Sequence, residues 1–443
     1  MGYSFSDIRS MSLNDIFMAN CVAVRMSENN IVMDFISENT KESEDGIMSF
    51  EIVSYERKKE KVSVKHLGLE TAKKVQRFHS SFPIYKKTPL VELNNLAKEL
   101  KVKNIYVKDE SYRFGLNAFK VLGGSFAIGN YIAKKLVEDI ENMPYERMIS
   151  KEVREKLGDL TFISATDGNH GRGVAWTANQ LKQKCVIYMP KGSAKERLDN
   201  IRAEGAEAEI TELNYDDAVR YSNNLAEKNG WVMVQDTAWD GYEDIPTWIM
   251  QGYTTMAYEA YNQLNGVKPT HIFVQAGVGS FAAAVQGFFG DVYGEDRPIT
   301  TIVEPNEAAC IFKTAKANDG KIHPVTGEMK TIMAGLACGE PTTVGWRILK
   351  DYADNFISCP DYVAAQGMRI LGNPLKGDEK IISGESGASS FGFVSEVLRN
   401  KDLKWLKEEL MLDENSVILF FNSEGDTDKE NYRKIVWDGE YTR

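Results

Sequence analysis

The chain lacks the cysteine and histidine patterns of secreted or metal-binding proteins. Its cysteines stand alone, without a Cys-x-x-Cys pair, at positions 21, 185, 310, 338 and 359. No disulfide framework is indicated, although a single Cys310–Cys338 bridge stays open, and we expect a reduced, cytoplasmic protein. The five histidines form no His-Glu-x-x-His motif and lie beside no cysteine at ligand spacing, so we expect no metal site.

The chain also has no excess of positive charge. The chain has 53 Lys and Arg residues against 64 Asp and Glu residues, a net charge of −11. This balance argues against nucleic acid or an anionic membrane as a partner held by diffuse charge. The longest uncharged run, residues 269–290, contains Gln275, Gln286 and four glycines. We therefore interpret it as strand, loop and helix, and expect no membrane span; no basic segment precedes an apolar one at the N-terminus, so we expect no secretion signal.

The remaining pattern is typical of an α/β protein. Residues 1–49 are polar and poorly patterned, and we treat them as an N-terminal extension. Helices are expected around residues 67–80 and 91–100. Short β-rich runs, separated by helical stretches, lie at 104–108, 161–164, 184–189, 231–234, 271–274, 300–303 and 417–421. This alternation predicts mostly parallel, twisted sheets flanked by helices on both faces.

Three polar loops that contain glycine are candidate anion sites. They lie at 165–171, 275–280 and 383–387, and we expect each to join a strand to a helix. Backbone N–H groups at the start of a helix attract anions. Several such sites in one crevice suggest a ligand with separated anionic groups, such as a cofactor phosphate and a substrate carboxylate. Ordinary turn chemistry explains any one loop about equally well.

The second loop has another interpretation. Residues 277–282, Gly-Val-Gly-Ser-Phe-Ala, fit the Gly-x-Gly-x-x-(Gly/Ala) pattern, and Glu304 ends the next expected strand. Such a pattern is found where dinucleotides bind. A nicotinamide-dependent dehydrogenase therefore stays an alternative, although it leaves the other two loops without a role.

Lys120 is the candidate nucleophile. It stands in an apolar stretch, Ala118-Phe119-Lys120-Val121-Leu122, that is followed by two glycines. Burial favours the neutral amine, which can form a Schiff base. A surface lysine whose stem packs on apolar neighbours is the alternative interpretation.

Five separated motifs together carry a family resemblance. They lie at 108–120, 166–173, 234–239, 276–280 and 423–428. In this order they resemble the fold-type II pyridoxal-phosphate enzymes, and within that superfamily they look like the diaminopropionate ammonia-lyases. The resemblance runs from about residue 65 to the C-terminus.

The resemblance implies roles for cofactor-binding residues. Lys120 would carry pyridoxal 5′-phosphate, Asn169 would lie beside its 3′-oxygen, and Ser423 would face its pyridine nitrogen. A hydroxyl there does not hold the nitrogen protonated, which favours elimination over transamination. The phosphate would be held by backbone N–H groups of Gly277, Val278, Gly279 and Ser280.

The substrate side departs from the dehydratases of this superfamily. Asp167 stands where those enzymes usually have a small residue, followed by Gly168 and His170. A carboxylate there needs a cation or acts as a base. Asp167 would then act on the D isomer, while Asp236 is a second candidate for holding the extra ammonium group. Asp167 as a helix N-cap, and His170 as a residue fixed by the start of a helix, are the alternatives.

The function implied is α,β-elimination of 2,3-diaminopropionate to pyruvate and two ammonia, acting on the L and also the D isomer. The alternatives are a serine/threonine dehydratase of the same fold, the dehydrogenase above, and a ligand-binding regulator without turnover. The resemblance also implies a homodimer. It implies two domains with the cofactor between them: a larger one at 50–122 and 237–443, and a smaller one inserted at 123–236.

Overall fold

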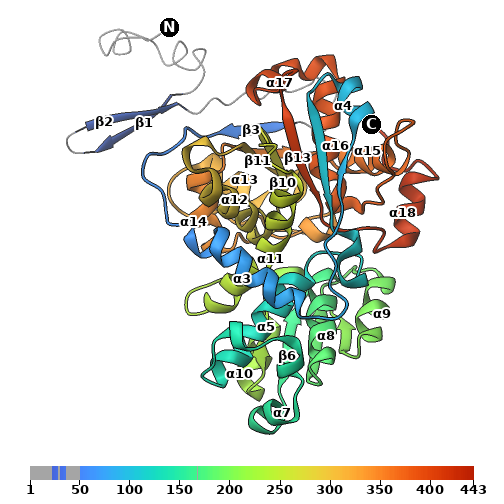
Figure 1. The fold of residues 1–443 in the computed structure, drawn as a ribbon. Helices are drawn as coiled ribbons and strands as arrows, with labels where there is room; N and C mark the ends of the chain where they lie inside the picture. Colours follow the sequence, from blue (N-terminus) through green and yellow to red (C-terminus); the bar gives the residue numbers. More distant parts are fainter. Residues whose placement is uncertain (1–21, 28–29, 36–49, 167) are drawn as a thin grey trace.

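The computed structural model describes residues 22–27, 30–35, 50–166 and 168–443 (Figure 1). Strands β1 (Val22–Ser27) and β2 (Asn30–Phe35) pair antiparallel in a two-stranded sheet of their own. The pattern of residues 1–49 did not indicate them. Two larger sheets and the helices that cover them form the rest of the described structure.

The larger sheet has seven strands in the order β3-β12-β11-β10-β13-β5-β4. The five central strands run parallel, and the edge strands β3 and β4 run antiparallel to their neighbours. The strands are β3 (Glu51–Ser54), β4 (Leu90–Glu92), β5 (Asn104–Asp109), β10 (His271–Gln275), β11 (Ile299–Pro305), β12 (Asn355–Cys359) and β13 (Val417–Asn422).

Helices cover both faces of this sheet, as its apolar strands predict. Ile272 and Val274 of β10 pack into one hydrophobic core, while Phe273 between them packs into the other. The first core includes residues of α3 (Leu69–Ser80), α5 (Val121–Lys135), α11 (Asp244–Gln263), α12 (Ser280–Tyr293), α13 (Cys310–Ala317) and α14 (Thr343–Tyr352). The second includes residues of α4 (Asn94–Leu100), α15 (Asp361–Gly372), α16 (Glu385–Arg399), α17 (Lys404–Glu409) and α18 (Lys429–Val436).

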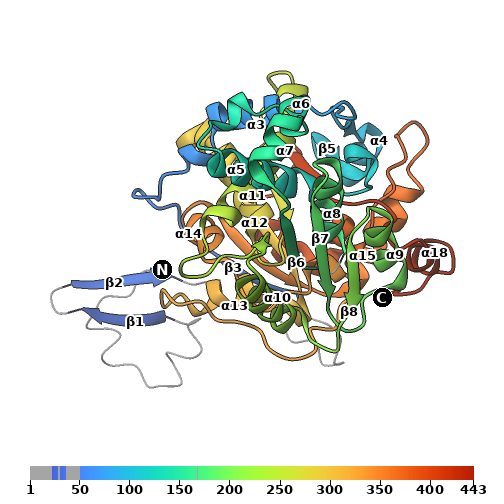
Figure 2. The same cartoon turned by 90° about the horizontal axis from the view of Figure 1, so that it is seen from below.

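The smaller sheet has four parallel strands in the order β8-β7-β6-β9. Figure 2 shows β8, β7 and β6 side by side. They are β6 (Thr161–Ala165), β7 (Lys184–Met189), β8 (Glu207–Ile210) and β9 (Val232–Met233). Phe162 packs toward α8 (Asn169–Gln180) and α9 (Lys195–Ala203), and the next residue, Ile163, packs toward α10 (Tyr215–Asn229). The short helices α6 (Tyr145–Met148) and α7 (Lys151–Leu157) precede β6. The predicted fold class, mostly parallel sheets between helices, is confirmed.

Some local predictions were wrong. Residues 90–92 form the edge strand β4, so the helix expected near 91–100 begins only at Asn94. The third glycine-containing loop, 383–387, leads into α16, but residues 373–384 before it contain no strand. Strands β3, β8 and β12 were not anticipated. The two domain boundaries stay a prediction.

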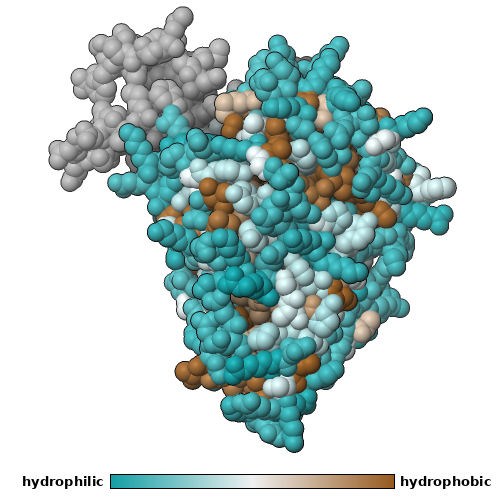
Figure 3. Space-filling view, viewed as in Figure 1, coloured by the Kyte–Doolittle hydropathy of each residue, from teal (hydrophilic) through white to brown (hydrophobic). Residues whose placement is uncertain are grey.

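Hydrophilic residues cover most of the face shown in Figure 3. Across the described parts of the chain, no helix is both long and apolar enough to traverse a bilayer. Cys310 and Cys338 are both buried and are separate thiols in this structure, so the bridge that the sequence left open is not formed.

Candidate active site

The site lies where the chain passes between the two sheets. After β5 the chain leaves the larger sheet and passes Lys120 before it enters α5, and from β9 it returns through Asp236 to α11. Lys120 Nζ donates a hydrogen bond to Asp236 Oδ2 over 3.0 Å. The two candidate residues, 116 positions apart, therefore meet at the two connections between the sheets.

Asp236 is a buried, ionised carboxylate. Burial opposes its ionisation, but Lys120, His170 and the Tyr215 hydroxyl together outweigh burial and lower the pKa of Asp236 to about 2. The Tyr215 hydroxyl donates a hydrogen bond to its other oxygen, Oδ1, over 3.3 Å. Asp236 thus holds a cation at the bottom of the pocket.

The loop 277–280 follows β10 and ends at the first residue of α12. Gly279 has φ +96°, a conformation that glycine adopts without strain. A Cβ atom on Gly277 would lie 3.1 Å from Cys338 Sγ, so the loop has little room for side chains. The Ser280 hydroxyl donates to the Asp236 carbonyl oxygen and ties the loop to the Lys120–Asp236 pair. The structure places the loop at a helix N-terminus, as expected, and its role as an anion site stays a prediction.

Asn169 and Glu424 meet across the pocket. Asn169 begins α8, and its Nδ2 donates to Glu424 Oε2, while Ser386 N donates to Glu424 Oε1 over 3.2 Å. A carboxylate of the chain itself therefore lies at the start of α16, and binding of a ligand anion by the third loop stays a prediction. Glu424 lies inside one of the recognised motifs, but its role was missed because nothing in the motif indicates its contact with α16.

Ser423 lies beside Glu424 in the same pocket. Gln275 Nε2 donates to Ser423 Oγ over 3.0 Å, and Gln275 Oε1 accepts from Ser390 Oγ over 3.1 Å. Because Ser423 Oγ accepts this bond, its own hydrogen is directed to another acceptor. The sequence motifs did not indicate Gln275 as its positioning partner.

The first loop is organised by Thr166. Its Oγ1 accepts hydrogen bonds from Gly168 N and Gly171 N over 2.9 and 3.1 Å. His170 is buried and its Nε2 lies 2.8 Å from the Val234 carbonyl oxygen. That contact fits the structural interpretation of His170. Asp167 lies outside the described residues.

A wider cavity of about 960 Å³ adjoins the pocket, and Arg197 of α9 and Glu385 of α16 line it. Arg197 Nη2 lies 3.9 Å from Glu385 Oε2. Burial, together with the nearby Glu424 carboxylate, raises the pKa of Glu385 to about 7.

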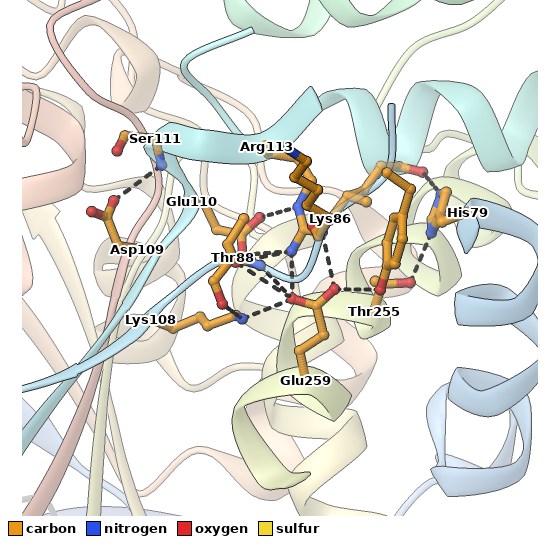
Figure 4. A network of polar contacts seen from close by, with 12 residues as sticks. His79, Lys86, Thr88, Lys108, Asp109, Glu110, Ser111, Arg113, Thr255 and Glu259 are labelled. Carbon is orange, nitrogen blue, oxygen red and sulfur yellow. Dashed lines mark hydrogen bonds and ion pairs between the residues drawn. The ribbon is translucent and has the colours of Figure 1, made fainter. Parts of the chain in front are cut away.

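A buried ion network anchors the segment before Lys120 (Figure 4). Arg113 lies between two carboxylates: its Nε donates to Glu110 Oε2 and its Nη2 to Glu259 Oε2, both over 2.8 Å. Lys108 Nζ donates to the same Glu259 oxygen over 2.7 Å. All four side chains are fully buried. The network thereby fixes the short 3₁₀ helix Glu110–Gly115 to α11. Arg113, within this 3₁₀ helix, precedes Lys120 by seven residues in the sequence.

The fold and the pocket agree with the family comparison. The sequence model of the family described as pyridoxal-phosphate dependent enzyme matches residues 82–409 of this chain. The chain belongs to this family. Its cofactor is therefore pyridoxal phosphate, which agrees with the sequence prediction.

Relatives within the pyridoxal-phosphate family are similar over most of their length. Diaminopropionate ammonia-lyase of Salmonella typhimurium is 52% identical over 369 residues, 82% of this chain and 91% of that protein. The crystal structure of holo diaminopropionate ammonia-lyase from Escherichia coli superposes with a TM-score of 0.84 at 47% identity, covering 89% of this chain and 98% of that chain. The same Escherichia coli enzyme in complex with D-serine has a TM-score of 0.83 with the same identity and coverage.

The residues present fit the pyridoxal-phosphate cofactor. Lys120, the loop 277–280 and Ser423 line one pocket, so an amine, backbone N–H groups for a phosphate and a hydroxyl would all be available to it. Glu304, the carboxylate that the dinucleotide interpretation required, accepts hydrogen bonds from Ile311 N and Phe312 N, over 2.9 and 2.6 Å. It is fully buried at the start of α13, so it does not face a ribose. The nicotinamide alternative is therefore not supported.

Proposed function

We propose that the chain catalyses the elimination of 2,3-diaminopropionate, with one water, to pyruvate and two ammonia. The observation that carries the proposal is the Lys120–Asp236 pair beside the loop 277–280, in which Asp236 is buried and Lys120 is half-buried. It places a second charged group next to the Schiff-base lysine, which suits a substrate with two amino groups. The 52% identity to the Salmonella typhimurium ammonia-lyase supports the same substrate.

The chain's own residues bind the cofactor and move protons. Pyridoxal phosphate, when bound, withdraws electrons from the Cα of an attached amino acid and so acidifies its Cα–H. Lys120 Nζ then accepts this proton on its own face of the substrate. Asp236, released from Lys120, holds the β-ammonium group until it leaves as ammonia. Ser423 donates toward the pyridine nitrogen, which its contact with Gln275 leaves it free to do.

The remaining predicted residues bind the two ends of the ligand. Asn169 would lie beside the 3′-oxygen, and the backbone N–H groups of the loop 277–280 would hold the phosphate. Gly168 and His170 line the side that takes the substrate carboxylate.

Asp167 is proposed as the base for the D isomer, on the opposite face from Lys120. The complex of the Escherichia coli enzyme with D-serine supports a site that accommodates D-configured ligands. Asp167→Asn should reduce turnover of the D isomer much more than that of the L isomer. Equal losses on both isomers would contradict the two-base assignment.

The deciding assay is pyruvate release by purified protein with added pyridoxal phosphate. We compare L- and D-2,3-diaminopropionate with L-serine and L-threonine. We expect diaminopropionate to be the best substrate. Turnover of serine or threonine alone, the latter to 2-oxobutyrate, would make the protein a dehydratase of the same fold.

Lys120→Ala tests whether Lys120 is the residue that forms the imine with the cofactor. The variant should lose the imine absorbance that borohydride reduction removes from the wild-type protein. A reducible imine that persists in Lys120→Ala would mean that another amine holds the cofactor.

We also propose that the protein is a cytoplasmic homodimer. The spread of single cysteines supports a reducing compartment. Light scattering of the purified holoprotein tests the dimer, and a mass of one chain would refute it.

A further inference from the structure

Tyr253 of α11 is a buried phenol in the cofactor pocket that no motif singled out. It is 1% exposed and lines the pocket together with Lys120 and Ser280. Its hydroxyl makes no hydrogen bond to any residue in the described part of the chain. A buried hydroxyl without a partner costs free energy, and native proteins usually satisfy such groups. Within the described part of the chain the Tyr253 hydroxyl has no partner, so it is open to a ligand in the pocket.

Two glycines hold the Tyr253 ring in this position. A Cβ atom on Gly252 would lie 2.3 Å from the Leu122 carbonyl oxygen, so α11 approaches α5 closely only because residue 252 is glycine. A Cβ atom on Gly123 would lie 2.6 Å from Cε1 of the Tyr253 ring. The ring thus occupies the space that a side chain at residue 123 would fill, three residues after Lys120.

The neighbours of the ring place it at the phosphate end of the pocket. The Tyr253 and Phe119 rings lie 4.7 Å apart between centroids, and Phe119 lies equally close to Phe281. Phe281 directly follows Ser280 in the first turn of α12, where the anion site lies. Tyr253 therefore lies close to the loop 277–280.

The charge around Tyr253 keeps it a hydrogen-bond donor. Burial and the Asp236 carboxylate raise the pKa of Tyr253, although the Lys120 ammonium opposes them. The phenol therefore keeps its proton over the physiological pH range. A phosphate dianion offers only acceptor oxygens, so a protonated phenol is complementary to it.

We propose that the Tyr253 hydroxyl donates a hydrogen bond to the phosphate of the bound cofactor. It supplies a side-chain donor to a cradle that is otherwise formed by backbone N–H groups of residues 277–280. The proposal rests on the proposed function only through its cofactor, not through the elimination reaction. The same donor would also attract inorganic phosphate to the apoprotein.

The test compares two ligands that differ only in the phosphate. Apoprotein is titrated with pyridoxal phosphate and with pyridoxal, and binding is followed by imine absorbance. Tyr253→Phe should weaken the affinity for pyridoxal phosphate by about 10-fold to 100-fold, the usual contribution of a hydrogen bond to a charged group. The affinity for pyridoxal should stay within about twofold of the wild-type value. Tyr258→Phe is the matched control, on the same helix but outside the pocket lining, and should change neither.

Stability of the apoprotein separates this role from a packing role. Tyr253→Phe removes only an oxygen that has no partner, so the apoprotein should melt at the same or a higher temperature. A packing role predicts a lower melting temperature and equal losses for both ligands. Either result, or unchanged affinity for pyridoxal phosphate, would overturn the proposal.

A measurement on the unsubstituted protein is independent of the variant. Adding inorganic phosphate to the apoprotein should change the tyrosine bands in ultraviolet resonance Raman spectra toward a hydrogen-bond donor. Unchanged bands at saturating phosphate would contradict the proposal. If wild-type protein binds pyridoxal phosphate but releases no pyruvate, the proposed elimination reaction is refuted. The role of Tyr253 is still decided by the affinity measurements.

Discussion

Replacing Glu259 with glutamine should destabilise the protein strongly, because Glu259 is the second carboxylate of the buried ion network. It accepts hydrogen bonds from Lys108 Nζ, Arg113 Nη1 and Nη2, and the Tyr85 hydroxyl, over 2.6 to 3.0 Å. With Glu110 it balances two buried cations. Glu259→Gln leaves Lys108 and Arg113 with one carboxylate between them.

Two arguments give the size of the loss. Breaking a buried pair by removing one charge typically costs about 3–5 kcal/mol. Burial opposes ionisation of Glu259, but Arg113 and Lys108 lower its pKa from 4.5 to about 2, and such a shift is worth about 3 kcal/mol. A depressed carboxylate pKa stabilises the fold above pH 4.5, and this stabilisation is lost as the pH falls to about 2. At neutral pH the variant should therefore lose about 3–5 kcal/mol of unfolding free energy.

Urea unfolding of the apoprotein at neutral pH, followed by tryptophan fluorescence, measures this loss. The control is Glu70→Gln, whose exposed pair with Lys73 should not contribute measurably. Adding Lys108→Met to Glu259→Gln restores the balance of charge and should recover part of the stability. A single variant within about 1 kcal/mol of the wild type would refute the mutual dependence of these charges.

Three further changes test other parts of the structure. Burial raises the pKa of Glu304 from 4.5 to about 8, so the folded state favours its protonated form, and the stabilisation present below pH 4.5 is lost as the pH rises to about 8. Glu304→Gln stays neutral, so urea midpoints should fall less over that interval than in the wild type; an identical fall would contradict the assignment. Gly279→Ala places a side chain at φ +96° with its Cβ 3.0 Å from Ile311 Cδ1. The variant should lose about 1–3 kcal/mol of unfolding free energy in urea, and its affinity for pyridoxal phosphate should fall in a titration. Unchanged affinity would mean that the loop does not hold the phosphate. Asp236→Asn removes the carboxylate partner of Lys120 and should slow pyruvate formation from diaminopropionate by about 100-fold or more, whereas a fully active variant would exclude Asp236 from the reaction.

The parallel core strands could be predicted from the sequence because they are buried on both faces and read as continuous apolar runs. Strand β7 at 184–189 has the predicted bounds, and β13 extends the predicted run by one residue. Strands β3 and β4 were missed because they have only four and three residues, too few to show a period. Strand β12 was missed although it is fully buried, because polar Asn355 and Ser358 interrupt its apolar run.

The site residues divide in the same way. Lys120 and the loop 277–280 could be found because each is a local motif, and the structure places both in one pocket. The contact between Lys120 and Asp236 could not be predicted, because it depends on how two chain connections meet in space. Tyr253 carries no motif at all; only its burial and its unsatisfied hydroxyl single it out, and both are properties of the folded chain.

The position of Lys120 and Asp236 on the two connections has a mechanical consequence. If one sheet rotates relative to the other, the two connections act as the hinge and the rotation axis passes through them. Displacement grows with distance from such an axis, so the Lys120–Asp236 pair stays nearly still. Arg197 and Glu385 lie outside the pocket lining, 3.9 Å apart in the lining of the wider cavity, so a rotation would move them more than it moves the Lys120–Asp236 pair. Such a rotation would widen the cavity while Lys120 and Asp236 keep their alignment.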